Sequence, residues 1–418
     1  MNEPVVDVDW HPPRSSTAAW VMYDLANTIF ALGVGSLYFA SWITERNVPD
    51  IGLSITVSAA MIVVIAAGPL LGARSDHRGR RMPYLVRFTV LAIIPTFFLA
   101  TVGVLPSLVL FALALIAVNL GSVMYDALLP DVSTTANRGI VSGLGVGVGY
   151  LGSFIALGVG IVALDRWGYP TVFRTIAVLF LVFSIPTFIF VRERPRPART
   201  GPEPRLRDSV QQLIASWRLA SRYEGVTRFL VGRFLYTDAI NTLIAGFLTI
   251  FVIEELSFTD SEVELLLGLA IVTAIAGGLL GGVIVDRFGA RRTLHLAIEL
   301  WIIAMSLGIV AATYDLRTLA WGLGAAGGFA LGATWSADRV YMARISPPRH
   351  LGEFYGLYAT VGRFATVLGP LVWGVTVDLF NLPRTAALGA LVGFLVVGRI
   401  VLAGVNDEPR RWEPADLE

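Results

Sequence analysis

Long apolar blocks separated by short polar segments dominate this sequence and restrict its fold more than any other feature. Each block holds about 20 or more mostly apolar residues, the length that an α-helix needs to cross the hydrocarbon core of a bilayer. Inside lipid every backbone N–H and C=O group must be paired within the protein, so such blocks are expected to be helices. The sequence therefore predicts an all-α membrane protein with twelve transmembrane helices. The expected spans are residues 15–44, 51–73, 83–104, 107–132, 140–164, 171–191, 227–254, 262–285, 292–313, 317–343, 352–379 and 385–404.

The composition supports a membrane protein and removes several classes of chemistry. Of the 418 residues, 55% are hydrophobic and 15% are charged, whereas a soluble domain is about a quarter charged. The absence of cysteine excludes disulfides, thiolate metal sites and cysteine catalysis. The apolar run that follows Arg14 is too long for a signal peptide, so it is expected to be the first span.

Arginines gather in alternate loops and predict the orientation of the chain. The poorer set of loops holds Arg46, Arg166, Arg174, Arg317 and Arg384, while most of the other arginines fall in the opposite set. Because arginine-rich loops stay in the cytoplasm, we expect a multi-pass protein of the cell (inner/plasma) membrane with both termini cytoplasmic. The expected partners are the lipid bilayer and a small-molecule substrate, with no nucleic acid, and the chain is expected to be a monomer.

The longest polar stretch, residues 192–226, lies midway along the chain. Within it Val210, Leu213, Ile214 and Trp217 follow i, i+3, i+4, i+7 spacing, with arginines around them. This spacing predicts an amphipathic helix. Two interpretations stay open: the helix lies on the inner leaflet, or it packs on the bundle as an ordinary linker helix.

The two halves of the chain repeat each other. Asp24 and Asn27 in the first span recur at one constant offset as Asp238 and Asn241 in the seventh. The loop after the second span recurs after the eighth, and a glycine pattern of the fifth span recurs in the eleventh. Such duplication is typical of transporters whose halves rock about a midplane site. The predicted domains are two pseudo-symmetric six-helix bundles, 1–191 and 227–418, joined by the linker 192–226.

These motifs carry a family resemblance. The segment from Gly72 to Arg81 and its second copy from Gly282 to Arg292 resemble the loop signature of the major facilitator superfamily. Further stretches look like the branch that includes the autophagy-related vacuolar amino-acid effluxers and their bacterial relatives. They are Trp20 to Thr28, Tyr125 to Asp131, Gly352 to Tyr358 and Leu368 to Leu371. The resemblance implies the major facilitator fold, alternating access and, for some members, amino-acid efflux. Asp126 and Arg363 depart from it, where Asn and Lys are expected.

The resemblance also implies a cytoplasmic latch made by the two loops. Asp76 and Asp286 would cap neighbouring helix N-termini, where carboxylates are favoured. Arg80 or Arg81 would pair with Asp131 at the end of the fourth span. The predicted gating residues are Asp76, Arg80, Arg81, Asp131, Asp286 and Arg291.

Ionisable residues inside the spans are the candidates for transport. Asp24 and Asp238 lie ten residues deeper than Arg14 and Arg228, which is about 15 Å at the helical rise and half of a ~30 Å core. A charge at that depth costs at least ~2.5–3.5 kcal/mol, so it is a functional candidate. The alternative is that these groups hydrogen-bond helices together. The predicted substrate- and proton-binding residues are Asp24, Asn27, Asp238, Asn241, Arg363 and Tyr150, which is the repeat counterpart of Arg363.

Arginines within the spans need anionic partners. Arg363 lies about eleven residues into its span, and a guanidinium cannot deprotonate there, so it must meet a carboxylate of the protein or of a ligand. Arg233 is shallower, and we expect it to extend toward the cytoplasm. Asp126, Asp131 and Asp338 are expected to form latch salt bridges or helix caps.

The sequence favours a secondary transporter over an enzyme. It has no phosphate-binding glycine-lysine loop and no metal-spaced histidine pair, so no cofactor or metal is expected and the energy must come from a gradient. The first hypothesis is a proton-coupled or facilitative transporter of amino acids or similar zwitterions. In it Arg363 meets the carboxylate, and Asp24 or Asp238 meets the amine. The alternatives are a cation-coupled sugar symporter, an amphipathic drug efflux transporter and a non-transporting sensor or scaffold.

Overall fold

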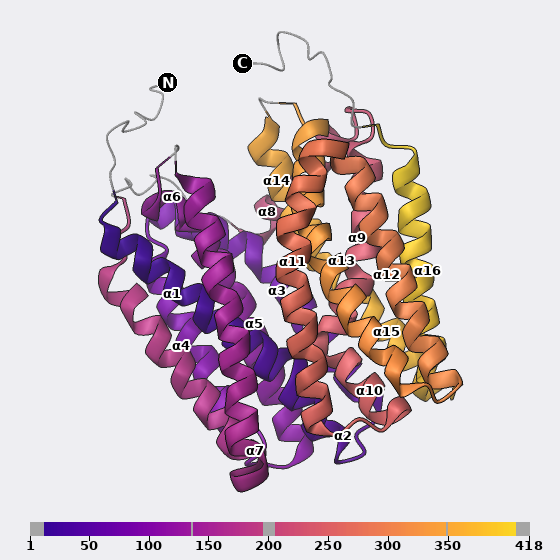
Figure 1. The fold of residues 1–418 in the computed structure, drawn as a ribbon. Coiled ribbons are helices and arrows are strands. Elements are labelled where there is room, and N and C mark those ends of the chain that lie inside the picture. The colour runs from indigo at the N-terminus through magenta and orange to yellow at the C-terminus, as the bar shows by residue number, and fades with distance from the viewer. Residues whose placement is uncertain (1–11, 135–136, 195–204, 348–349, 407–418) are drawn as a thin grey trace, which may run out of the picture. The chain divides into compact units, whose positions relative to one another are not determined.

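The computed structural model describes residues 12–134, 137–194, 205–347 and 350–406, and within these ranges the chain is helical without any strand (Figure 1). The all-α prediction is confirmed. Nine helices of the described part are long and apolar enough to cross a membrane. One of them, Gly147–Phe190, covers most of two expected spans, while α4 (Met82–Phe98) is shorter and α13 (Arg317–Ile345) is not among the nine. The count of twelve therefore stays a prediction.

The described helices form two compact units. The first unit comprises residues 1–34 and 66–206, and the second comprises residues 35–65 and 207–418. The helix α3 (Asp50–Arg78) contributes to both, because its first half belongs to the second unit.

The first unit is built around α1 (Arg14–Phe30) and the long α7 (Arg138–Phe190). The hydroxyl of Thr187 donates to the Ala19 carbonyl at 2.6 Å, which ties the end of α7 to the start of α1. A Cβ on Gly152 of α7 would collide with the Leu25 carbonyl, so the two backbones approach closely, as small residues permit in membranes. Gly168 adopts φ 70° and ψ 177° and divides α7 into two helical stretches. The other helices of the unit are α4, α5 (Val104–Ala127) and α6 (Leu129–Val132).

The second unit holds most of the remaining helices. Small residues again set their spacing, since a Cβ on Gly332 of α13 would collide with the backbone of Ala274 in α11. In chain order the elements are α2 (Phe39–Thr44), α8 (Leu206–Ala220), α9 (Val226–Thr242), η2 (Leu243–Phe247), α10 (Leu248–Leu256), α11 (Asp260–Phe288), α12 (Ala290–Thr313), α13, α14 (Leu351–Phe364), α15 (Leu368–Gly374), η4 (Val375–Leu379) and α16 (Arg384–Ala403).

Helix irregularities occur beside the repeated aspartates. After Asp24 the first span widens into the π-helical segment η1 (Ala31–Tyr38), and after Asp238 the seventh widens into η2. The eleventh span is interrupted at residues 365–367, between α14 and α15. Wide turns often mark functional sites, and a broken helix in a membrane leaves backbone groups that need partners.

Candidate functional site

Asp238 and Asn241 support the break between α14 and α15. The Asp238 carboxylate accepts the backbone N–H of Gly369, in the first turn of α15, at 2.8 Å. The Asn241 amide donates to the carbonyl of Ala365, just after α14, at 2.9 Å. Asp238 thus bonds an N–H group that α15 leaves unpaired, and Asn241 bonds a carbonyl beside the end of α14. Asp238 is fully buried, and its Oδ1 has no hydrogen-bond partner among the described residues.

Asp24 and Asn27 have a different environment in the first unit. The Asp24 side chain is partly exposed and lies against two glycines of α7, because a Cβ on Gly145 or Gly149 would come within 3.3 or 3.2 Å of its Oδ2. No described residue donates a hydrogen bond to this carboxylate. The Oδ1 atom of Asn27, one turn away, is buried and also lacks a described partner. This face of α1 therefore carries acceptor groups that the bundle leaves unsatisfied.

A buried ion pair joins α9 and α13 in the second unit. The Nε atom of Arg233 lies 3.4 Å from Oδ2 of Asp338, and the two side chains are 6% and 0% exposed. The Arg233 guanidinium also lies 3.6 Å from the ring centroid of Tyr358, a cation–π contact. Tyr236 donates to Asp338 at 3.4 Å. The expectation that Arg233 extends toward the cytoplasm is wrong, because its charge is balanced within the bundle by Asp338, which forms this internal pair.

Arg363 and Tyr150 are partly exposed and belong to different units. Arg363 lies in the last turn of α14, two residues before the carbonyl that Asn241 holds. The hydroxyl of Thr366 donates to the Arg363 carbonyl at 2.6 Å. That Asp24, Asp238 and Arg363 share one cavity stays a prediction.

The loop between α3 and α4, which the arginine pattern assigns to the cytoplasm, shows a contact that sequence reasoning missed. The backbone N–H groups of Arg81 and Met82, at the start of α4, donate to the Glu193 carboxylate beyond the end of α7. The Arg81 guanidinium donates to the Ala127 carbonyl at the end of α5. Glu193 is the lone acidic residue in an arginine-rich run, which is a signal that could have identified it. The side chain of Asp76 lies outside the described residues, so its capping role stays a prediction.

The other predicted latch residues differ in their burial and in their hydrogen bonds. Asp131 is fully buried in α6, while Arg80 is exposed. Arg291 donates to the Ala403 carbonyl at the end of α16, at 2.7 Å. Asp286 is exposed in the last turn of α11, and its carboxylate bonds no residue in the described part of the chain. Its capping of a neighbouring helix therefore has no contact that supports it.

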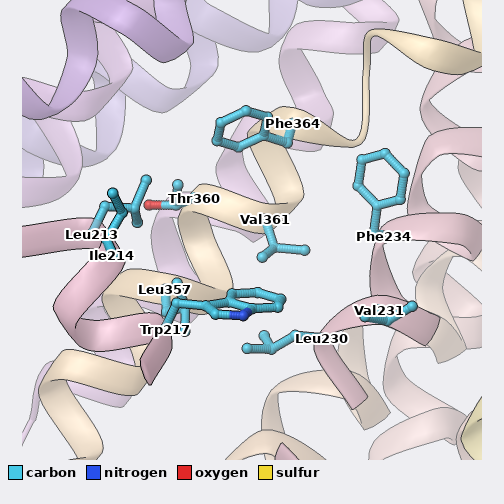
Figure 2. A pocket seen from close by; sticks show the side chains of 10 residues that line it. All are labelled: Leu213, Ile214, Trp217, Leu230, Val231, Phe234, Leu357, Thr360, Val361 and Phe364. Atoms are coloured by element: carbon cyan, nitrogen blue, oxygen red, sulfur yellow. The ribbon is translucent and has the colours of Figure 1, made fainter. Parts of the chain in front are cut away.

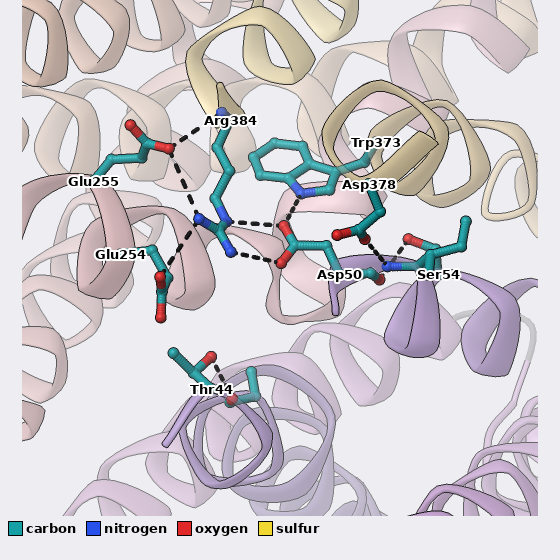
Figure 3. A network of polar contacts seen from close by, with 10 residues as sticks. Thr44, Asp50, Ser54, Glu254, Glu255, Trp373, Asp378 and Arg384 are labelled. Atoms are coloured by element: carbon teal, nitrogen blue, oxygen red, sulfur yellow. Dashed lines mark hydrogen bonds and ion pairs between the residues drawn. The ribbon is translucent and has the colours of Figure 1, made fainter. Parts of the chain in front are cut away.

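A polar network in the second unit was also missed (Figure 3). Asp50, at the start of α3 and 2% exposed, accepts two hydrogen bonds from the Arg384 guanidinium, at 2.8 and 2.9 Å. The Trp373 indole donates to the same carboxylate at 2.8 Å. Arg384 also lies 3.4 Å from Glu254, and its backbone N–H donates to Glu255 at 3.1 Å. These contacts join the start of α3 to α10, α15 and α16, at the ends of the spans that the arginine pattern assigns to the outer side.

Comparisons with known proteins agree with this architecture. The chain matches the family described as "vacuole effluxer Atg22 like" over residues 36–413. It is 26% identical to the uncharacterised MFS-type transporter YxiO of Bacillus subtilis, over 93% of this chain and 94% of that protein. It is 25% identical to autophagy-related protein 22-1 of Aspergillus fumigatus, over 64% of this chain and 48% of that protein, so it spans about half of that fungal relative.

Two solved structures share the fold. A mutant of the nucleoside transporter NupG superimposes with a TM-score of 0.74 at 12% identity, over 93% of this chain and 99% of that one. A bacterial homologue of the human lysosomal transporter Spinster, inward-facing and unoccupied, gives a TM-score of 0.68 at 16% identity, over 96% and 98% of the two chains. At such identities the likeness concerns the fold alone.

Proposed function

We propose a substrate class and a binding mode for this chain, which belongs to the vacuole effluxer Atg22 like family and is a multi-pass membrane transporter of the MFS type. The proposed solute is an amino acid or a similar small zwitterion. It is carried by alternating access, and its transport is coupled to protons. We place the protein in the cell membrane with both termini cytoplasmic, because arginines concentrate in that set of loops. A cysteine introduced by Ser15→Cys should then react with impermeant reagents only from the inner side, and labelling from outside would contradict this topology.

The observation that carries the proposal is the Asp24 carboxylate. It lies within a membrane span, is partly exposed, and receives no hydrogen bond from any described residue. A carboxylate in such a place is costly unless a ligand or a proton satisfies it. Asn27 adds an unsatisfied carbonyl oxygen one turn away. Together they suit a substrate ammonium group, which donates hydrogen bonds and carries the opposite charge, or a coupling proton.

Arg363 is the proposed partner of the substrate carboxylate. Its planar guanidinium can bind a carboxylate through two parallel hydrogen bonds. It lies in the last turn of α14, directly before the break in the eleventh span. Backbone flexibility at this break would move the guanidinium, so its position depends on what supports the break.

Asp238 and Asn241 are proposed as positioning residues for Arg363. Asp238 holds the first turn of α15, and Asn241 holds the Ala365 carbonyl. Both come from α9, so the two sides of the break are fixed to one helix. In this proposal Asp238 acts on the substrate through α14, and Asp24 acts on it directly.

The test is transport by the purified protein in proteoliposomes, measured as uptake and counterflow of a labelled amino-acid panel with and without a pH gradient. Each transported amino acid should be compared with its amide, which lacks the carboxylate, and with its decarboxylated amine. The wild-type protein should prefer the amino acid at least tenfold, and Arg363→Ala should lose this preference while unfolding at an unchanged temperature.

The matched control is Asp315→Asn, which alters an exposed carboxylate in the loop between α12 and α13. Asp315 has a positive φ of 53°, which Asn tolerates well, so this variant should transport like the wild type. Transport of the amides as fast as the amino acids by the wild-type protein would exclude the proposed role of Arg363. No transport of any zwitterion would exclude the proposed substrate class.

A further inference from the structure

An apolar pocket lies between the linker helix α8 and the helices α9 and α14, and the transport proposal does not use it (Figure 2). Its volume is about 380 Å³, within the range of about 300–1,000 Å³ that small-molecule sites occupy. Figure 2 shows the Trp217 indole extending toward Leu230, with Phe234 and Phe364 farther along the pocket. All of the lining residues belong to the second unit.

The lining of the pocket suits a hydrocarbon chain and has few groups that could hydrogen-bond a polar ligand. Nine of the ten lining residues are aliphatic or aromatic, and the remaining one is Thr360. The Thr360 hydroxyl already donates to the Gly356 carbonyl of its own helix, at 2.9 Å. A polar ligand would therefore lose hydrogen bonds to water without replacing them, whereas an alkyl chain would gain apolar contacts with the lining side chains.

The rim of the pocket is open. Ile214 and Trp217 of α8 are 46% and 37% exposed, and Phe364 of α14 is 38% exposed. The amphipathic helix expected from the sequence is present as α8, but its apolar face is only partly covered by the bundle. The apolar surface of α8 that remains is available to a molecule that enters from the bilayer.

The depth of the pocket fits the inner leaflet. Leu230 and Phe234 lie four and eight residues after the start of α9, which is ~6 and ~12 Å at the helical rise. The hydrocarbon core is ~30 Å thick, so these residues lie in its cytoplasmic half. An occupant with its alkyl part at this depth would have its polar end at the level of the lipid head groups, where α8 lies.

The charge around α8 favours an anionic head group. Residues 205–228 contain five arginines and two acidic residues. Arg207, Arg218, Arg222 and Arg228 all have exposed side chains. Basic residues on an amphipathic helix attract anionic lipids by about 1 kcal/mol each, and arginine binds phosphate through paired hydrogen bonds.

We propose that this pocket binds an acyl chain of an anionic phospholipid of the inner leaflet, whose phosphate is held by arginines on and beside α8. The occupant contacts Val361 and Phe364 of α14, the helix whose Gly362 lies against Arg233. The lipid thus acts as a wedge between the linker helix and the helix that carries Arg363. The inference is independent of which solute the protein transports.

The test is lipid binding by the full-length protein in detergent, measured by native mass spectrometry. Phosphatidylglycerol should be compared with phosphatidylcholine of the same chains. Val231→Trp places a bulky ring at the pocket, where Val231 is 41% exposed, and should reduce phosphatidylglycerol binding at least tenfold. The matched control is Val182→Trp on α7, a valine that is 50% exposed and does not line the pocket. It should bind phosphatidylglycerol like the wild type.

A separate double variant tests the contact between the arginines and the lipid head group. Arg218→Gln combined with Arg222→Gln should reduce phosphatidylglycerol binding to the level of phosphatidylcholine. Arg166→Gln should not, because Arg166 lies in α7 at a position that the arginine pattern assigns to the outer side. In a parallel titration, phosphatidylglycerol with brominated chains should quench tryptophan fluorescence saturably, and Trp217→Phe should remove that component. Equal binding of both lipids to the wild type, or equal binding by Val231→Trp and Val182→Trp, would overturn the proposal and indicate unselective contact with bilayer lipid or detergent.

Discussion

The two repeated spans, the first and the seventh, carry the same Asp and Asn residues but use them differently. Asp238 is fully buried and accepts the N–H of Gly369, and Asn241 bonds the Ala365 carbonyl. Asp24 is partly exposed, lies against Gly145 and Gly149 of α7, and receives no hydrogen bond from a described residue. Duplication supplied one pair of polar groups to each half. In the second half they became supports for a broken helix.

The contrast extends to the neighbouring charges. In the second half Asp338 is balanced by Arg233. By the offset that relates Asp24 to Asp238, the first half has Ala19 where the second has Arg233. The buried Asp338 of the second half is therefore paired within the protein, whereas no described residue donates a hydrogen bond to Asp24 of the first half. In the transport proposal the second half supplies the positioned cation, Arg363, and the first half supplies Asp24, the group that exchanges partners during transport.

The largest effect should come from breaking the charge balance of the second half. Arg233→Ala leaves Asp338 buried without its cation, and loss of one member of a buried pair costs about 3–5 kcal/mol. Thermal unfolding in detergent should show a large fall in midpoint. The double variant Arg233→Met with Asp338→Leu should recover most of the stability, because it removes both charges. A single variant as stable as the wild type would mean that the pair does not support the second half.

The next largest effect should be a loss of transport caused by a substitution in the first half. Asp24→Asn removes the negative charge and the ability to bind a proton, but it preserves the shape of the side chain. We expect transport to fall at least a hundredfold, or to become independent of pH, with an unfolding midpoint close to that of the wild type. Uptake at several pH values and thermal unfolding provide the two measurements. Normal transport with normal pH dependence would show that Asp24 is a packing residue.

The sequence predicted the helical architecture well, because apolar blocks of bilayer length have few alternatives. It also placed a boundary between residues 164 and 171, and the structure has the Gly168 break there. The predicted count of twelve spans was not confirmed at α13, because this helix contains several glycines, including Gly322, Gly324 and Gly327, which add little hydropathy. Length identifies a span only where composition supports it.

The partners of the charged residues were less predictable. Depth identified Asp238, but its partner is a backbone N–H at a helix break, and no side-chain pattern reveals such a group. Asp50 and Arg384 are 334 residues apart in sequence, and nothing local indicates their contact. Arg233 was misplaced because a long side chain near a helix end usually extends toward water, whereas here a buried aspartate holds it.

A smaller effect is expected at Asp238, and it tests whether this carboxylate has the same role as Asp24. Asp238→Asn keeps an oxygen that can accept the Gly369 N–H, so transport should stay within a few-fold of the wild type. Asp238→Ala leaves that N–H unsatisfied, at a cost of about 1–3 kcal/mol, and should lower the unfolding midpoint and raise the KM for the substrate. If Asp238→Asn abolishes transport as Asp24→Asn does, both carboxylates act on the substrate and the halves are functionally alike.

The smallest effect should come from the network around Asp50, where residues 35–65 of the first repeat join the second unit. Arg384→Gln removes a charge, but its amide can still donate to Asp50, and the Trp373 indole also remains bonded. Arg384 is 21% exposed, so solvent screens part of the interaction, and we expect a change of about 1 kcal/mol. The state in which the start of α3 is separated from the start of α16 should become up to about fivefold more populated. A change of 1.4 kcal/mol corresponds to a tenfold change in an equilibrium constant.

Spin labels can measure this separation directly, because the chain has no cysteine to compete. Glu45→Cys and Leu382→Cys place labels at two exposed positions of the second unit that have no positive φ, near Asp50 and Arg384. The matched control is Arg317→Gln, which breaks an exposed pair with Glu262 between the starts of α13 and α11, also on the side that the arginine pattern assigns to the outside. It should leave the distance distribution unchanged. If Arg384→Gln and Arg317→Gln give the same distribution, the Asp50 network does not hold these segments together, and other contacts do, such as the hydrogen bonds from Tyr38 to Glu264 and from Thr249 to Ser36.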